Sequence, residues 1–247
     1  MTGVDACRGG WAGVDLDTGE DPDPTGEAGA GRDARGGRDT GSGDSPVRVS
    51  VRVAGSLAEL LAGAAPGQVV GIDMPLGLRA SGWRAADAEA RQRLGVRRSS
   101  IFAIPPAAVW EQPDYQSALA VCRRLTGQGF SVQAWGLRGK LREAADYRAH
   151  APQRLYEVHP ELSFATMAGA PLPEPKTGPV GQALRRSVLA AAGLVLTDDP
   201  AWRRATVDVL DAAAVAWTAR RIAADQAVVL PDPPQTGEDG LEIAIRY

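Results

Sequence analysis

Short runs of alternating or continuous hydrophobic residues dominate the first third of the chain, and such runs are typical of β-strands. The sequence TGVDACRGGWAGVDLD (residues 2–17) predicts a hairpin with a glycine-rich turn. The strict alternation in VRVSVRVAG (47–55) predicts another strand beside it. QVVGIDMPLGL (68–78) is apolar up to Asp73, which indicates a buried central strand.

Helical patterns follow these strands. Residues 56–64 predict a short helix in which Ser56 is the N-cap and Glu59 completes a capping box. Further helices are predicted over residues 83–95, 113–128, 138–150, 178–193 and 206–226. The other segments predict an irregular or extended stretch over 96–106, a strand that breaks at Pro160 within 154–164, and a terminal strand over 240–247. Strands that alternate with helices in this way predict an α/β fold with a mixed sheet.

The length of 247 residues and the 44% hydrophobic content are sufficient for one domain over residues 1–247 with a sizeable core. Residues 17–46 are rich in Gly, Asp and Pro and hold almost no apolar residues, so we expect a disordered acidic loop inserted into the hairpin. Residues 79–150 are expected to form a mostly helical insertion.

Charge is unevenly distributed along the chain. The formal net charge is only -3, which does not indicate nucleic-acid binding by the whole surface. Residues 15–46 carry a net -6, whereas residues 79–98 carry a net +4. Such a local basic patch can attract a polyanion, although a solvated helix face is the simpler explanation.

The number of cysteines and the hydropathy of the chain bear on its cellular location. Cys7 and Cys122 alone support neither a disulfide framework nor a zinc site. The first predicted strand begins near the third residue and leaves no room for a signal peptide, and no apolar run is long enough to span a membrane. We therefore expect a cytoplasmic protein that does not act at a membrane.

Four aspartates indicate a possible chemistry. Asp5 and Asp73 each end an apolar strand, in the contexts GVD and GID, while Asp208 and Asp211 lie three apart on one helix face. Ligands of α/β sheets gather beyond the strand ends, and converging carboxylates repel one another unless a cation lies between them. Mg²⁺ and Mn²⁺ favour carboxylate ligands, and two such ions can hydrolyse a phosphodiester.

Each acid also has a simpler explanation when taken alone. Asp5 is suited to an Asx role in the hairpin turn, and Asp73 to a turn that ends its strand. Asp208 is favoured by the helix dipole in a first turn, and Glu161 follows Pro160 as ordinary N-terminal helix chemistry. A capping role suits Asp211 less well. The four aspartates together, in this order, are what a two-metal site requires.

Several motifs resemble one family. GVDACRGGW, GIDMPLGL, RRSSIFAIPP, WGLRGKL, EVHPELSF and DVLDAAAVAW are similar to the family catalogued as domain of unknown function 429, over the whole chain except residues 17–46. Members of this family are regarded as predicted nucleases with a ribonuclease-H-like fold, so the resemblance implies this fold and a nuclease activity. Holliday-junction resolvases are more distantly similar, and that resemblance implies metal-binding roles for Asp5, Asp73, Asp208 and Asp211. Their second acid is a glutamate, whereas this chain has the shorter Asp73.

Other side chains are candidates for the same site. Glu161 is a further catalytic candidate beside the four aspartates, and His159 is suited to proton transfer. The candidate phosphate contacts are Arg8, Arg97, Arg98, Ser99, Lys140 and Lys176. For each of them a solvent-facing or turn position is the alternative explanation.

The function predicted from the sequence is a nuclease or phosphodiesterase that uses Mg²⁺ or Mn²⁺ and acts on a nucleic acid or nucleotide. One alternative is a non-catalytic scaffold of the same fold that binds a nucleotide or a protein. A second is an ATP-dependent phosphotransferase of the sugar-kinase type, which ranks lower because only isolated glycines follow residue 180. The sequence does not indicate an oligomeric state.

Overall fold

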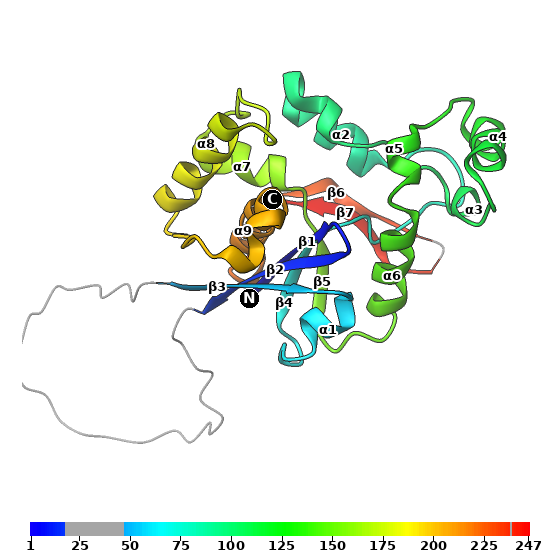
Figure 1. The fold of residues 1–247 in the computed structure, drawn as a ribbon. Coiled ribbons are helices and arrows are strands. Elements are labelled where there is room, and N and C mark those ends of the chain that lie inside the picture. The colour runs from blue at the N-terminus through cyan, green and yellow to red at the C-terminus, as the bar shows by residue number, and fades with distance from the viewer. Residues whose placement is uncertain (18–46, 238) are drawn as a thin grey trace, which may run out of the picture.

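A five-stranded mixed sheet with helices on both faces forms the centre of the computed structural model, which describes residues 1–17, 47–237 and 239–247 (Figure 1). The strand order is β3-β2-β1-β4-β5. β1, β4 and β5 are mutually parallel, and β2 is antiparallel to both of its neighbours. The strands are β1 (Thr2–Cys7), β2 (Gly10–Asp17), β3 (Arg48–Ala54), β4 (Val69–Asp73) and β5 (Arg154–Glu157). The expected α/β class with a mixed sheet is confirmed.

The N-terminal hairpin forms as predicted, and its glycines explain the tight turn. Gly9 adopts a φ of +84°, a left-handed conformation that is costly for other residues. A Cβ on Gly10 would lie 2.0 Å from the Ala54 carbonyl oxygen, so only glycine allows β3 to approach here. At the other end of the hairpin, Asp17 still pairs with Arg48 in the sheet and does not belong to the expected loop. The rest of that loop, residues 18–46, lies outside the described residues.

The long helix α9 (Thr206–Ala223) packs directly against one face of the sheet. Two glycines make this approach possible. A Cβ on Gly3 would lie 2.1 Å from the Ala216 backbone nitrogen, and one on Gly71 would lie 2.8 Å from the Val215 side chain. The helix therefore contacts β1 and β4 with no side chain between the backbones at Gly3.

The opposite face of the sheet is covered by α1 (Leu57–Leu61) and α6 (Arg138–Arg148). The predicted cap of α1 is confirmed, because the Glu59 backbone N–H donates to Ser56 Oγ at 3.2 Å. The Glu59 carboxylate in turn accepts a hydrogen bond from the Gly55 N–H at 3.1 Å. The glutamate therefore bonds the residue before the N-cap and not the Ser56 N–H that a capping box would use, and the two hydrogen bonds fix the turn that leads from β3 into the helix.

Between β4 and β5 the described chain is helical apart from its connecting loops. The elements before α6 are α2 (Ala85–Leu94), η1 (Gly95–Ser100), α3 (Ala107–Trp110), α4 (Tyr115–Thr126) and α5 (Val132–Trp135). The segment 96–106, for which the sequence left an irregular or an extended conformation open, begins in the 3-10 helix η1 and continues as a loop. It forms no strand.

The C-terminal part adds three helical elements and a small second sheet. These are α7 (Pro160–Ala168), α8 (Pro179–Ala191), η2 (Pro200–Ala205) and the antiparallel pair β6 (Val229–Thr236) and β7 (Glu242–Arg246). β7 confirms the predicted terminal strand. β6 was not predicted, because its sequence VLPDPPQT holds three prolines, which donate no ladder hydrogen bond.

Candidate functional site

Asp5 and Asp73 lie opposite each other in the adjacent parallel strands β1 and β4. Asp73 is the last residue of β4, whereas β1 continues for two residues beyond Asp5, contrary to the expectation that Asp5 ends its strand. Because parallel strands in register present equivalent positions side by side, both carboxylates meet at the same edge of the sheet. Asp5 is buried and Asp73 is partly buried. Among the described residues, neither carboxylate forms a hydrogen bond or an ion pair. The two acids are therefore free to bind a ligand.

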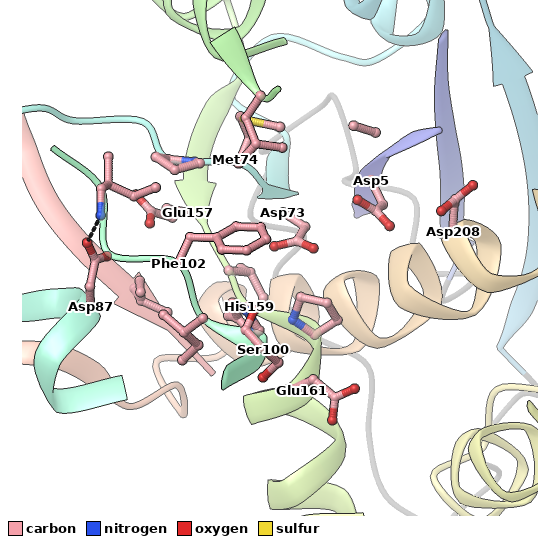
Figure 2. Close-up of a pocket in the computed structure, with 18 of the residues that line it drawn as sticks. Asp5, Asp73, Met74, Asp87, Ser100, Phe102, Glu157, His159, Glu161 and Asp208 are labelled. Atoms are coloured by element: carbon pink, nitrogen blue, oxygen red, sulfur yellow. Dashed lines mark hydrogen bonds between the residues drawn. The ribbon is translucent and has the colours of Figure 1, made fainter. Parts of the chain in front are cut away.

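The first turns of α9 bring two more carboxylates to this edge. Asp208 is partly buried and lines the same pocket as Asp5 and Asp73 (Figure 2). Asp211 lies three residues further along the helix and is completely buried. The backbone of α9 lies against β1 at Gly3, two residues before Asp5.

Lys176, in the loop before α8, supplies a positive charge to these acids. Its Nζ donates to Asp211 Oδ2 at 2.6 Å. The other oxygen of the same carboxylate, Asp211 Oδ1, is buried and has no hydrogen-bond partner in the part of the chain that the structure describes. An unpaired buried acceptor of this kind costs free energy, and a bound cation or proton donor would remove that cost.

Burial shifts the pKa values of these acids upward. Burial raises the pKa of Asp5 well above its usual range, and the charges of Asp73 and Asp211 raise it further. Burial raises the pKa of Asp73 to about 7, although Lys176 acts in the opposite direction. The pKa values of Asp208 and Asp211 are also raised, again mainly by burial.

The pKa of Lys176 is also raised, and for a lysine this favours the charged form. Burial alone lowers the pKa of Lys176, but the charge and hydrogen bond of Asp211 outweigh it, so the pKa rises and the amine stays protonated. The cluster thus holds one permanent cation and several carboxylates that resist ionisation together.

Two further acids that line the pocket are held by arginine. Glu157, at the end of β5, forms an ion pair with the buried Arg84 and accepts a hydrogen bond from the Leu76 N–H at 3.0 Å. Asp87 lies 3.3 Å from the same guanidinium and accepts from the Ile104 N–H at 2.8 Å. Their oxygens are engaged in holding α2 and the loop after η1, so they are structural acids.

Glu161, a candidate from the sequence, also has an arginine partner. Its Oε1 lies 2.5 Å from Arg185 Nη2, and both side chains are buried. Arg97 lies further away, at 3.9 Å from the same oxygen. The Glu161–Arg185 pair joins α7 to α8 beside the pocket. The carboxylate itself is not free in the way that Asp5 and Asp73 are.

The pocket has a volume of about 390 Å³ and lies at the carboxyl ends of β1, β4 and β5 (Figure 2). One end is acidic and holds Asp5, Asp73, Asp208 and Lys176. The rest is mainly apolar. The residues of this apolar part include Met74, Pro75, Ile101, Phe102, Ile104, Leu137, Val158 and Ile245.

The remaining candidates from the sequence occupy different places. Ser99 lines the pocket, and the exposed Arg98 precedes it in η1. Arg8 is exposed in the hairpin turn and does not line the pocket. Lys140 pairs with Glu143 at 3.0 Å and lies over the Trp11 ring, so its charge serves a contact outside the pocket.

Sequence reasoning missed two features of the site. It did not identify Phe102 as a pocket residue, although this aromatic lies in the RRSSIFAIPP motif between a polar and a proline-rich stretch. It also did not identify Arg185 as the partner of Glu161. No local signal indicates that pair, because 24 residues separate the two side chains.

The described residues give no preformed metal cluster: no three His, Cys, Asp or Glu side chains are arranged to hold an ion. The donor set nevertheless consists of hard oxygen atoms, and it includes two unengaged carboxylates and the unpaired Asp211 Oδ1. These groups are chemically suited to Mg²⁺ or Mn²⁺, with Lys176 supplying a positive charge in the ion's absence.

In the part of the chain that the structure describes, no helix is both long and apolar enough to cross a membrane.

One of three comparisons with known proteins gives a match, and it agrees with the family resemblance. No curated protein and no solved structure gives a significant match. The family model described as "Protein of unknown function (DUF429)" matches residues 3–236, and the chain therefore belongs to this family.

Proposed function

We propose that this protein hydrolyses phosphodiester bonds of a nucleic acid or nucleotide with the help of Mg²⁺ or Mn²⁺. The observation that carries the proposal is the in-register placement of Asp5 and Asp73 at the last pair of the parallel β1–β4 ladder, without partners among the described residues. Asp208 and Asp211 approach the same place from α9. We also propose that the protein is cytoplasmic and that its fold is of the ribonuclease-H-like type.

The charges of the site explain why a cation is needed. A phosphodiester is an anion, and the pocket presents Asp5, Asp73 and Asp208 against the single ammonium group of Lys176. The other pocket carboxylates are already neutralised by arginines. Without an added positive charge, ionised acids would repel the phosphate. Divalent ions would supply that charge, activate a water and stabilise the leaving oxygen.

The chain's own residues would divide the work as follows. Asp5 and Asp73 would hold the ions from the sheet, and Asp208 and the free oxygen of Asp211 would hold them from α9. Lys176 fixes the orientation of the Asp211 carboxylate through its hydrogen bond, and its position at the pocket lets it attract the phosphate. Glu161 acts as a positioning residue, because it anchors α7 through Arg185.

One observation favours a second candidate function. Because Lys176 already compensates Asp211, the cluster is partly neutral without metal. A non-catalytic module that binds a nucleotide or another ligand in the same pocket would need only this charge compensation by Lys176 and no metal ion. The two candidates differ in metal-dependent turnover, which only the first requires.

The experiment is hydrolysis of a chromogenic phosphodiester and of labelled single-stranded and double-stranded DNA and RNA, with Mn²⁺ or Mg²⁺ and with EDTA. Asp5→Asn is compared with Asp146→Asn, which makes the same chemical change at an exposed position on α6. We expect metal-dependent turnover that Asp5→Asn reduces by at least ~100-fold and Asp146→Asn leaves unchanged. Equal turnover in both variants, or none in the wild type, would count against hydrolysis.

A further inference from the structure

The pocket has two chemically different parts. Asp5, Asp73, Asp208 and the Lys176 ammonium lie in one part. The rest of the lining is mainly apolar, and the acids within it, Asp87, Glu157 and Glu161, are paired with arginines. Phe102 is the benzyl ring in this apolar wall, and 37% of its surface is exposed although it is a large hydrophobic residue. Figure 2 shows Phe102 and Asp73 entering the same pocket from different elements. A ligand that fills this space therefore needs a charged end and a flat apolar end.

His159 adds a polar atom to the wall with Phe102. Its Nε2 lies 3.3 Å from the Ser100 carbonyl oxygen, and an N–H at this position donates to it. Burial lowers the pKa of His159, so the ring is neutral and its Nδ1 is an acceptor. This Nδ1 is buried and has no hydrogen-bond partner among the described residues.

The size of the pocket limits what can enter. A volume of about 390 Å³ lies within the range of small-molecule sites, which is roughly 300–1,000 Å³. A base pair within a duplex exposes only its edges, so it cannot place a ring face on Phe102. A base reaches such a wall only when it is unstacked and unpaired.

We propose that the pocket takes one unpaired nucleotide, with its base on Phe102 and His159 and its phosphate toward Asp5, Asp73 and Lys176. The phosphate half rests on the proposed function, whereas the base half rests on the apolar wall alone. The preferred ligand is therefore a single strand or a free nucleotide, and blunt duplex is excluded from the pocket.

The test is equilibrium binding, measured by fluorescence anisotropy in Mg²⁺ with phosphorothioate-linked oligonucleotides that slow cleavage. A labelled eight-nucleotide single strand is compared with a blunt duplex of the same length, and unlabelled AMP is the competitor. Competition by AMP at micromolar concentration identifies a free nucleotide as sufficient. Displacement only by oligonucleotides identifies the strand as the ligand. Both results support an unpaired nucleotide.

The variants are Phe102→Ala, Phe102→Tyr and the control Val96→Ala, which alters a side chain that is 91% exposed and does not line the pocket. Loss of one stacking surface should weaken single-strand binding about tenfold in Phe102→Ala. Phe102→Tyr keeps the ring and should bind like the wild type, as should Val96→Ala. Thermal unfolding of each variant confirms that it is folded.

Two results would overturn the proposal: duplex binding as tight as single-strand binding, or an unchanged affinity in Phe102→Ala. Failure of hydrolysis is a separate result. If single strands bind through Phe102 but no phosphodiester is cleaved, the nucleotide pocket stands and the hydrolytic function falls. If cleavage occurs without dependence on Phe102, the pocket proposal falls and hydrolysis stands.

Discussion

Lys176 and Asp211 form a pair in which only one half of the carboxylate is satisfied. Lys176 Nζ lies 2.6 Å from Asp211 Oδ2, while Oδ1 is buried and no described residue bonds it. The lysine side chain is 41% exposed and comes from a loop, whereas Asp211 is fixed in the middle of the sheet–helix contact. The pair therefore consists of a fixed acid and a cation on a flexible stem.

We expect Lys176→Met to destabilise the protein, because it leaves the buried Asp211 carboxylate without its cation. The free energy of unfolding in urea should fall by about 2 kcal/mol at pH 8. The loss should be smaller at pH 5, where the folded state can protonate Asp211, whose pKa is raised. Lys176→Arg keeps the charge and should lose less. An equal loss at both pH values would show that Asp211 is not the group involved.

The stability of the metal-free protein should depend on pH through Asp73. Its folded-state pKa is about 7, well above the ordinary value of 3.8, so the folded state binds the proton more tightly than the unfolded state. The stabilisation from this group is complete below about pH 4 and is lost as the pH rises to about 7.

Asp73→Asn removes this titration and mimics the protonated acid. It should raise the free energy of unfolding by roughly 2 kcal/mol at pH 8 and change it little at pH 4. Urea unfolding in EDTA at both pH values is the measurement. A variant that is less stable than the wild type at pH 8 would contradict the assigned burial of this carboxylate.

Gly3 should be indispensable for the position of α9. A Cβ at this residue would meet Ala216 N at 2.1 Å and Ala212 O at 2.2 Å, both of which are backbone atoms that cannot rotate away. We expect Gly3→Ala to cost about 3 kcal/mol or more in stability, measured by thermal or urea unfolding. Gly63→Ala is the control, because no atom lies within 4 Å of its added Cβ. Similar stability of both variants would refute the close approach.

Glu161→Gln should test whether this acid is structural or binds metal. The substitution leaves the buried Arg185 guanidinium without its counter-charge, so we expect a loss of about 3 kcal/mol in stability. The double variant Glu161→Gln/Arg185→Met should recover part of it. Metal affinity of the folded Glu161→Gln protein, measured by calorimetry, should remain close to that of the wild type. A complete loss of metal binding would make Glu161 a ligand.

The sequence predicted the parts of the site that depend on regular elements. Asp73 ends an apolar strand and Asp5 lies two residues before the end of another, and parallel pairing brings the two positions together. Asp208 and Asp211 lie on the helix whose pattern is clearest in the chain. Nothing in the sequence around Gly3 and Gly71 indicates that a helix will pack against them. The close approach of α9 to the sheet therefore could not be predicted.

Contacts between side chains far apart in the sequence could not be predicted from the sequence pattern. The Lys176–Asp211 and Glu161–Arg185 pairs join side chains that lie 35 and 24 residues apart, with no periodicity to indicate them. β6 was missed because its prolines contradict the usual strand composition. Phe102 lies in a loop that is held where the Ile104 N–H donates to the Asp87 carboxylate, a contact that only the folded chain reveals.

Calorimetric titration of Mn²⁺ and Mg²⁺ tests the metal site most directly, with the wild type beside the Asp5→Asn/Asp73→Asn variant. Neutral amides at these positions remove two charges that burial disfavours, so the variant should remain folded, and urea unfolding verifies this. The account predicts saturable metal binding by the wild type that disappears in the variant. Equal binding by both proteins, or no binding by either, would contradict a metal site at the ends of β1 and β4.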